Sequence, residues 1–387
     1  MRHSGGIEMT DHIAGLRISH VVQPIARPVS DAKVATGRQV PLAAVDMVFA
    51  EITDEDGTTG TGFTYTLRAG GTALQALAEE IAPMVIGARG ADVQRIWEML
   101  GWRTNSLGAC GAAFHVLAAF DTALWDLKAR RAKLPLAQLL GSFRDGVRVY
   151  NSGGQYLQAS IDEMSQAARD SVARGIGGIK MKVGQPDWRE DIRRIEAVRD
   201  AIGPDVALMI DANQQWSRAE ALAFCRRVDG MGLEFIEEPL DARDHAGHGA
   251  LAAQLVTPVA TGEMLASYDE HAALIAAGGA RVLQADCPRI GGVTPMLRVM
   301  ELARSQRVAL APHFVMEQHL PLVAAFPTEG WVEHFDWLEP LFNERLEIRD
   351  GRMWVPDRPG FGLTMSDTAR EHTKRSVTLR DSPEGGD

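Results

Sequence analysis

The stretch from Val206 to Pro239, VALMIDANQQWSRAEALAFCRRVDGMGLEFIEEP, decides the fold class of this chain. It opens with a short apolar run, Val206–Ile210, and ends with a second one, Leu233–Ile236, each typical of a buried strand. The segment between them begins with Ser217 and Glu220 in the spacing of a capping box, which indicates the start of a helix. A strand, a helix and a second strand in about 30 residues predict two parallel strands joined by a helical crossover.

The same alternation continues on both sides of this unit, from Val147 to Val332. Further capping boxes are expected at Ser160/Glu163 and Ser267/Glu270, and Thr294-Pro295 is typical of a helix start. Eight strands are predicted in all: Val147–Tyr150, Ile179–Val183, Val206–Ile210, Leu233–Ile236, Pro258–Ala260, Val282–Gln284, Val308–Ala311 and Trp331–Val332. Eight strands that alternate with helices predict an α/β fold of the (β/α)8 barrel type.

The chain before the barrel has a different pattern. Val45–Ile52 is an apolar run that ends in the turn signal Asp54–Gly57, and residues 73–84 and 111–130 have helical spacing. We therefore predict an α+β capping domain over residues 1–140 and a barrel over 141–356, with residues 357–387 returning to the capping domain. The first ten residues, MRHSGGIEMT, lack the apolar stretch of a secretory signal and are expected to form a loose tail.

Composition narrows the function classes. The chain has 387 residues and a formal net charge of −11, which disfavours nucleic acid and anionic membrane surfaces as partners. No apolar run approaches the ~18 residues that a membrane span requires. The three cysteines, Cys110, Cys225 and Cys287, have no metal-site spacing and are expected to be free thiols in a reducing cytoplasm.

Polar side chains follow one predicted barrel strand after another. Steps of 29, 26, 26, 23, 27 and 20 residues, each about one strand–helix unit, separate seven of them: Lys182, Asp211, Glu237, Glu263, Asp286, His313 and Glu333. Because the chemistry of a (β/α)8 barrel lies at the carboxyl ends of its strands, we expect all seven to meet at one rim.

Three of these residues point to a metal. Asp211, Glu237 and Glu263 stand at the ends of three neighbouring strands, where like charges require a cation. Hard oxygen ligands with room for water and substrate oxygens suit Mg²⁺.

The others point to proton transfer. Lys180 and Lys182 lie two residues apart on a strand and are expected to face the barrel mouth together, where burial and the second ammonium would lower the pKa of the lysine that acts as a base. Asp286 is expected to orient the imidazole of His313 from the adjacent strand. Glu333, if its pKa is raised enough to keep it protonated, would donate a hydrogen bond to substrate oxygens. Two bases beside a metal suit abstraction of a proton α to a carboxylate.

This constellation resembles the mandelate racemase subgroup of the enolase superfamily, over essentially the whole chain. The resemblance rests on the Lys180-x-Lys182 pair, the three carboxylates, the Asp286/His313 dyad and Glu333, with their spacing. It implies a modified TIM barrel, (β/α)7β, with an α+β N-terminal capping domain that the C-terminal segment completes. It also implies a homo-oligomeric enzyme with Asn213 among its substrate-binding residues.

Within the subgroup the sequence is similar to the L-talarate/galactarate dehydratases. The supporting stretches are Pro28–Lys33, Thr36–Arg38, Arg68–Gly71, Gly177–Lys180, Asp211–Trp216, Thr261–Leu265, Ala311–Phe314 and Leu341–Glu344. The cations Lys33 and Arg68 in the N-terminal loops would favour a second substrate carboxylate. We therefore expect a dehydratase of six-carbon diacids (aldarates), galactarate and L-talarate first, that converts an acid sugar to a 2-keto-3-deoxy acid with some epimerase activity.

Three alternative functions would use the same barrel residues. A dehydratase of a monoacid such as L-lyxonate or L-fuconate would differ in the pocket above the barrel. A racemase or epimerase of a 2-hydroxy acid would act on a substrate without a β-leaving group. A binding or sensor protein on the same scaffold would be inactive. The residues also leave open whether Lys182 or His313 is the base for the physiological substrate.

Overall fold

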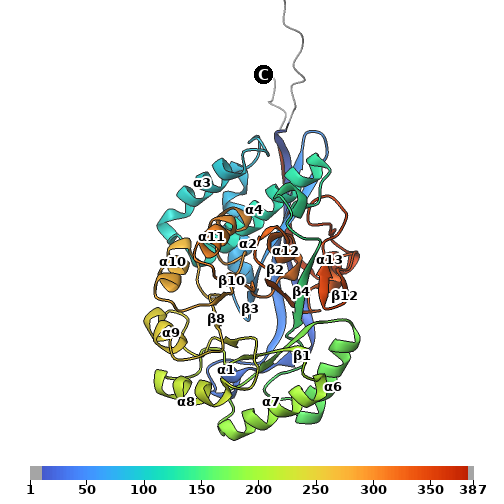
Figure 1. The fold of residues 1–387 in the computed structure, drawn as a ribbon. Helices are drawn as coiled ribbons and strands as arrows, with labels where there is room; N and C mark the ends of the chain where they lie inside the picture. The colour runs from blue at the N-terminus through green and yellow to red at the C-terminus, as the bar shows by residue number, and fades with distance from the viewer. Residues whose placement is uncertain (1–10, 382–387) are drawn as a thin grey trace, which may run out of the picture.

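The structure, a computed structural model, describes residues 11–381 (Figure 1). The expected N-terminal tail, residues 1–10, lies outside the described residues, as do residues 382–387 of the segment that we expect to return to the capping domain. The described chain forms a four-stranded sheet and a ten-stranded sheet whose core is a ring of parallel strands.

The parallel strands confirm the predicted barrel. They are β4 (Gly146–Asn151), β5 (Gly178–Lys182), β6 (Ala207–Asp211), β7 (Ile236–Glu237), β8 (Val259–Thr261), β9 (Val282–Leu283), β10 (Ala309–Leu310) and β11 (Trp331–His334). Neighbours along the chain pair in parallel from β4 to β10, and β11 returns to pair with β4. Each of the eight predicted strands overlaps one of these.

Seven helices connect the eight strands. They are α6 (Ile161–Ala173), α7 (Trp188–Ile202), α8 (Arg218–Val228), α9 (His245–Ala252), α10 (Tyr268–Ala276), α11 (Val293–Ser305) and α12 (Met316–Ala325). The last strand, β11, is followed by the short 3₁₀ helix η3 (Glu339–Leu341) and not by an eighth barrel helix. The architecture is therefore (β/α)7β, as the family resemblance implies, and not the complete (β/α)8 that the strand count alone predicts.

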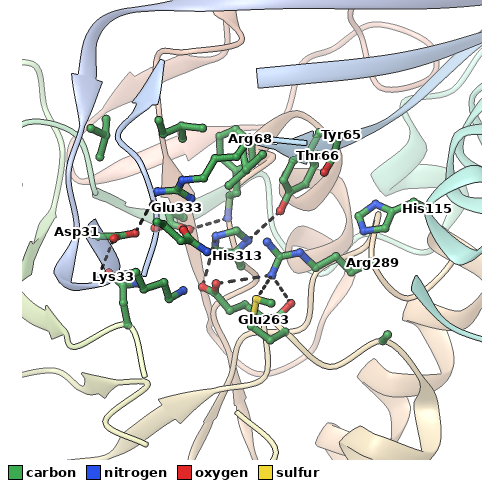
Figure 2. A pocket seen from close by; sticks show the side chains of 18 of the residues that line it. Asp31, Lys33, Tyr65, Thr66, Arg68, His115, Glu263, Arg289, His313 and Glu333 are labelled. Atoms are coloured by element: carbon green, nitrogen blue, oxygen red, sulfur yellow. Dashed lines mark hydrogen bonds and ion pairs between the residues drawn. The ribbon is translucent and has the colours of Figure 1, made fainter. Parts of the chain in front are cut away.

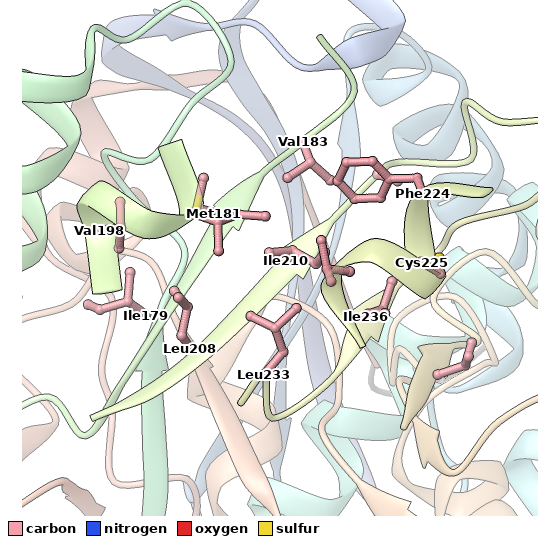
Figure 3. Close-up of a cluster of buried hydrophobic side chains, with 14 of the residues drawn as sticks. Ile179, Met181, Val183, Val198, Leu208, Ile210, Phe224, Cys225, Leu233 and Ile236 are labelled. Carbon is pink, nitrogen blue, oxygen red and sulfur yellow. The ribbon is translucent and has the colours of Figure 1, made fainter. Parts of the chain in front are cut away.

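The alternation of side chains along β5 determines which of them point into the barrel. Ile179, Met181 and Val183 belong to an apolar cluster between the barrel strands and helices α7 and α8 (Figure 3). Since successive side chains of a strand point to opposite faces, Lys180 and Lys182 point into the barrel. The burial of the apolar set against the helices thereby fixes the direction of both lysines.

The N-terminal part is an antiparallel sheet covered by helices. Its strands are β1 (Ile13–Val29), β2 (Leu42–Asp54), β3 (Thr59–Leu67) and β14 (Thr373–Arg380), in the order β14-β1-β2-β3. Its helical segments are α1 (Ala32–Ala35), α2 (Gly71–Ile81), η1 (Ala82–Met84), α3 (Val93–Thr104), η2 (Asn105–Leu107), α4 (Gly111–Ala132) and α5 (Leu136–Leu139). Helix α4 packs so closely on β3 that a Cβ on Gly62 would lie 2.2 Å from the backbone nitrogen of Ala123, so glycine is required there.

The C-terminal segment contacts both parts. The hairpin of β12 (Glu347–Arg349) and β13 (Arg352–Trp354) pairs with barrel strand β4. After α13 (Asp367–Glu371), β14 pairs with β1 at the edge of the N-terminal sheet. Among the described residues, no helix combines the length and apolar character needed to cross a membrane.

Three of the four predicted helix starts are confirmed, two of them with a complete capping box. Ser160 and Ser217 form complete capping boxes with the glutamates three residues on. Ser267 caps α10, but the carboxylate of Glu270 accepts from the backbone N–H of Ala266, so that box is incomplete.

The predicted start at Thr294-Pro295 is wrong. Helix α11 begins at Val293, and the residue that caps it comes from another helix. Asp121 of α4 accepts from both the backbone N–H and the hydroxyl of Thr294. A carboxylate supplied from 173 residues away replaces the local cap.

Candidate active site

The polar side chains predicted at the strand ends meet at one end of the barrel. They lie at or beside a cavity of about 670 Å³ between the barrel and the N-terminal loops. Its lining includes seven of the predicted site residues: Lys33, Arg68, Lys182, Asn213, Glu263, His313 and Glu333. Figure 2 labels five of them, Lys33, Arg68, Glu263, His313 and Glu333. The other four, Lys180, Asp211, Glu237 and Asp286, are buried at the same end of the strands, at most 2% exposed.

The two lysines are engaged by carboxylates. Nζ of Lys180 lies 2.7 Å from Glu237 Oε2 and 2.7 Å from Glu333 Oε1. Nζ of Lys182 donates to Oδ2 of Asp211. Lys180 therefore links carboxylates of β7 and β11, whereas Lys182 contacts one carboxylate, at the end of the adjacent strand β6.

The expected lowering of the lysine pKa is wrong for this arrangement. Burial does lower the pKa of Lys182, and so does Lys180, but the carboxylate of Asp211 outweighs both and leaves the pKa raised. The pKa of Lys180 is raised as well, since Glu237 and Glu333 outweigh its burial. The spacing in the sequence reveals that two lysines lie together, but it does not reveal the carboxylates that contact them and raise their pKa.

The three predicted metal ligands are buried oxygen donors. Asp211 and Glu237 are fully buried and Glu263 is 5% exposed. Burial, together with the negative charges of Asp211, Glu333 and Glu263, raises the pKa of Glu237 well above its ordinary value. Anionic oxygens crowded together in this way require a cation.

Within residues 11–381, no group of three or more His, Cys, Asp or Glu side chains has the geometry of a formed metal site. The reason is that each predicted ligand already contacts a cationic group. Lys180 and Lys182 hold Asp211 and Glu237, while Glu263 lies 3.6 Å from Arg289 and 3.4 Å from His313. An all-oxygen, acidic and buried donor set nevertheless fits Mg²⁺ in its chemistry.

The predicted dyad is formed. Nδ1 of His313 lies 2.8 Å from Oδ2 of Asp286. Burial raises the pKa of Asp286, but Arg289 and His313 outweigh it and hold the pKa below the ordinary value. An ionised carboxylate accepts only, so Nδ1 carries the ring proton and donates it to Asp286. In the neutral form of the ring, the lone pair is then on Nε2.

Glu333 does not meet the condition, a raised pKa, under which it would donate a hydrogen bond to the substrate. Its carboxylate accepts from Ser152 Oγ over 2.5 Å and from the backbone N–H of Phe314 over 2.6 Å, and it also contacts Lys180. Burial raises the pKa of Glu333, but Lys180 and His313 outweigh it and bring the pKa to about 2. Glu333 is therefore an ionised acceptor that holds Lys180 in place.

Asn213 and Lys33 have groups free for a ligand. Asn213 has a left-handed backbone, φ 47°, and donates from its backbone N–H and its side chain to Asp211. Its side-chain oxygen is buried and has no hydrogen-bond partner among the described residues. Lys33 extends toward Glu263 and His313 (Figure 2), and its ammonium makes no hydrogen bond or ion pair with the described chain.

The side chain of Arg68 already has partners within the chain. Its Nε donates to the backbone oxygen of Val40 over 2.9 Å, and Nη2 lies 3.5 Å from Asp31 Oδ2. Asp31 is also the N-cap of α1, accepting from the backbone N–H groups of Lys33 and Val34. Arg68 thus braces the loop that carries Lys33 while it lines the cavity.

Sequence reasoning missed several neighbours of the site. Tyr65 donates to Asp286, and Arg289 contacts Glu263 and Asp286. Gln284 donates to Glu237 over 2.6 Å. Arg289 follows Asp286 by three residues, a spacing that was available in the sequence. Tyr65 has no such signal, because it lies in the N-terminal sheet, 221 residues from Asp286.

Family profiles and curated relatives place the chain in the same family that the sequence resembles. The family profile described as "Mandelate racemase / muconate lactonizing enzyme, N-terminal domain" matches residues 13–141, and "Enolase C-terminal domain-like" matches residues 163–369. The chain is 50% identical to the L-talarate/galactarate dehydratase of Salmonella typhimurium LT2, over 97% of this chain and 94% of that protein. It is 34% identical to the 3,6-anhydro-alpha-L-galactonate cycloisomerase of Streptomyces coelicolor, over 83% and 89%.

Solved structures of dehydratases superimpose on nearly the whole chain. The L-talarate dehydratase of Polaromonas sp. JS666, complexed with Mg and L-glucarate, superimposes with a TM-score of 0.93 at 52% identity, covering 96% of this chain and all of that one. The Salmonella enzyme liganded with Mg and L-lyxarohydroxamate superimposes with a TM-score of 0.96 at 48% identity, covering 99% and 98%. With both domains matched and the barrel-end residues in place, this chain belongs to the mandelate racemase/muconate lactonizing enzyme family of the enolase superfamily.

Proposed function

We propose that this protein is a Mg²⁺-dependent acid-sugar dehydratase, a hydro-lyase whose first substrates are galactarate and L-talarate. The observation that carries the proposal is that Lys182 and His313, two groups able to transfer protons, reach one cavity beside three buried carboxylates. The relatives named for L-talarate and galactarate, half identical over nearly the full chain, support the substrate.

The binding of the reacting carboxylate follows from the charges at the cavity floor. Asp211, Glu237 and Glu263 would hold Mg²⁺, which supplies positive charge where the substrate carboxylate becomes more negative as its α-proton leaves. The ammonium of Lys180, held by Glu333, adds a fixed positive charge beside the same position. The unpartnered oxygen of Asn213 accepts a hydrogen bond from a substrate hydroxyl.

Proton transfer is divided between two residues. Nε2 of His313 carries the free lone pair, because Asp286 keeps the ring proton on Nδ1. Lys182 approaches from β5, on the other side of the ring of strands from β10. The α-configuration of the substrate decides which of the two removes the proton, and Lys182 can do so only when its contact with Asp211, which raises its pKa, is broken. The conjugate acid of the opposite residue then protonates the departing β-hydroxyl, and the enol product tautomerises to a 2-keto-3-deoxy acid.

A second carboxylate on the substrate is supported by the N-terminal loops. Lys33 presents to the cavity an ammonium that has no hydrogen-bond or ion-pair partner among residues 11–381, and Arg68 holds its loop in place. A monoacid such as L-lyxonate or L-fuconate would leave that ammonium unpaired. Return of a proton to either face would make the enzyme an epimerase as well, which is the second candidate activity.

The test is a screen of the purified protein with Mg²⁺ against aldaric and aldonic acids, following 2-keto acid. We expect galactarate and L-talarate to react faster than any monoacid. Faster reaction of L-lyxonate, L-fuconate or mandelate would overturn the substrate assignment. Absence of both 2-keto acid and α-proton exchange with every acid would make the chain a binding protein and overturn the dehydratase.

We also propose the domain limits given above, a homo-oligomeric state and a cytoplasmic location. Pairing of β14 with β1 supports the return of the C-terminal segment to the capping domain. Exposed Trp102 and Leu107, 75% and 62% accessible, supply apolar surface for contact between copies. Three free cysteines suit a reducing compartment. Light scattering of the purified protein tests the oligomer, since a monomer at micromolar concentration would contradict it.

A further inference from the structure

A tyrosine of the N-terminal sheet reaches the dyad of the barrel. Tyr65, on β3, is 1% exposed, and its hydroxyl donates to Oδ2 of Asp286 over 2.5 Å. The same hydroxyl oxygen lies 3.2 Å from Nδ1 of His313. Figure 2 shows the hydroxyl directed at His313. The contact therefore joins the capping part of the chain to two residues of the barrel.

The hydroxyl is fixed because the ring is packed on several sides. Phe314 meets the Tyr65 ring edge-on, with centroids 4.9 Å apart and an interplanar angle of 79°. His115 of α4 does so at 6.3 Å and 87°. The guanidinium of Arg289 lies 5.7 Å from the ring centroid. A buried ring held in this way leaves the hydroxyl little freedom to leave Asp286.

The carboxylate of Asp286 has a fixed set of donors. Oδ1 accepts from the backbone N–H of Arg289 over 3.1 Å, while Oδ2 accepts from both Tyr65 and Nδ1 of His313. With its proton directed to Asp286, the Tyr65 oxygen also offers a lone pair to the Nδ1–H of His313. Three atoms, Oη, Oδ2 and Nδ1, thus form a closed triangle that sets the plane of the imidazole and aims Nε2 at the cavity.

We propose that Tyr65 is a positioning residue for His313, acting through Asp286, so that the capping domain takes part in the chemical step. The inference rests on the proposed function. The inference predicts different effects on the two proton-transfer residues, because Lys182 is held by Asp211 and does not contact Tyr65, Asp286 or His313. Loss of the Tyr65 hydroxyl should weaken proton transfer by His313 and leave proton transfer by Lys182 unchanged.

The test is Tyr65→Phe, which keeps the ring, in two backgrounds. In Lys182→Ala, exchange of the substrate α-proton with D₂O comes from His313, and we expect Tyr65→Phe to lower its kcat by about tenfold or more with little change in KM. In His313→Asn, with a substrate of the opposite α-configuration, exchange comes from Lys182, and Tyr65→Phe should leave it unchanged. Equal loss in both backgrounds, or loss in neither, would overturn the inference, since a merely structural role would affect both.

A second measurement does not depend on turnover. The proton on Nδ1 of His313 gives a downfield ¹H NMR signal that is identified by its loss in His313→Asn. We expect the signal to move in Tyr65→Phe and to stay in place in Tyr268→Phe, which removes a hydroxyl from a residue 41% exposed on α10. An unmoved signal in Tyr65→Phe would overturn the inference even if no aldarate reacts, an outcome that by itself would overturn only the proposed function.

Discussion

Lys182 contacts Asp211, His313 contacts Asp286 and Glu263, and both side chains line the same cavity. Because one residue starts the elimination and the other completes it, we expect Lys182→Ala and His313→Asn each to lower dehydration by about 10²–10⁴ or more. The measurement is the rate of 2-keto acid formation. Exchange of the α-proton should survive in one of the two variants for a given substrate, and wild-type turnover in both would refute the assignment.

Glu263 should be needed for the metal and not for the fold. It lies at the cavity surface, where its carboxylate contacts Arg289 and His313 and no apolar cluster. We expect Glu263→Gln to weaken Mg²⁺ binding, measured by titration calorimetry, while the circular dichroism spectrum and the thermal midpoint stay near those of the wild type. Unchanged Mg²⁺ affinity in the folded variant would remove Glu263 from the ligand set.

Glu317, on α12, is a buried carboxyl outside the proposed chemistry. Burial raises its pKa to about 8, from an ordinary value of 4.5. A group whose pKa is raised by folding costs stability as pH increases from its unfolded to its folded pKa, because the unfolded chain releases the proton first. Glu317→Gln removes this cost. We expect equal thermal midpoints near about pH 5 and a variant more stable by several degrees near about pH 9.

A midpoint difference for Glu317→Gln that is the same at both pH values would contradict this account. Asp269→Asn, at an exposed position in the first turn of α10, is a control that removes one carboxylate without burial.

Sequence reasoning located the charged residues of the site but not their partners. Positions at strand ends follow from hydrophobic runs, so the meeting of Lys180, Asp211, Glu237 and His313 could be predicted. Protonation depends on contacts of about 3 Å, and these depend on side chains from other strands. The pKa directions of Lys182 and Glu333 were therefore expected with the wrong sign.

Among the elements, the loop that contains α1 controls the far end of the cavity. The ammonium of Lys33 lies there without an ion pair to the described part of the chain, whereas Arg68 ties the loop to the end of β3 through Asp31 and Val40. We expect Lys33→Ala to lower kcat/KM for an aldarate by more than for the matching aldonate, by about tenfold for the loss of one charged contact. Arg68→Ala should act in the same direction, through the position of the loop.

The comparison is a set of kcat/KM ratios, diacid to monoacid, for each variant. Arg38→Ala is the matched control, because Arg38 lies on the same loop and its side chain is exposed and bonded to Gln215 outside the cavity lining. An unchanged ratio in Lys33→Ala would exclude Lys33 from binding the second carboxylate.

Elements whose signals are local were predicted, and elements stabilised from a distance were not. The helix starts at Ser160, Ser217 and Ser267 were predicted because a serine cap and the backbone N–H it accepts from are three residues apart. Helix α11 takes its side-chain cap from Asp121 of α4. Strand β1, 17 residues long, alternates poorly, since Leu16 and Ile18 belong to one apolar cluster and Val21 to another. Neither feature has a period that a sequence window detects.

At the scale of the whole molecule, the barrel was predictable because its units repeat. Each strand–helix unit buries one apolar face, and the repetition fixes the order of the strands. The capping part has no repeat, and its contacts with the barrel, such as Tyr65 with Asp286, join residues far apart in the chain. The placement of Tyr65 at the dyad could therefore come only from the structure.

Dehydration of an aldarate by this site requires a metal ion bound by the buried carboxylates Asp211, Glu237 and Glu263. The measurement that tests it most directly is 2-keto acid formation from galactarate and L-talarate by one protein sample with Mg²⁺, after EDTA, and after Mg²⁺ is restored. The account predicts turnover, complete loss and full recovery. Undiminished turnover of either aldarate in metal-free buffer would contradict it.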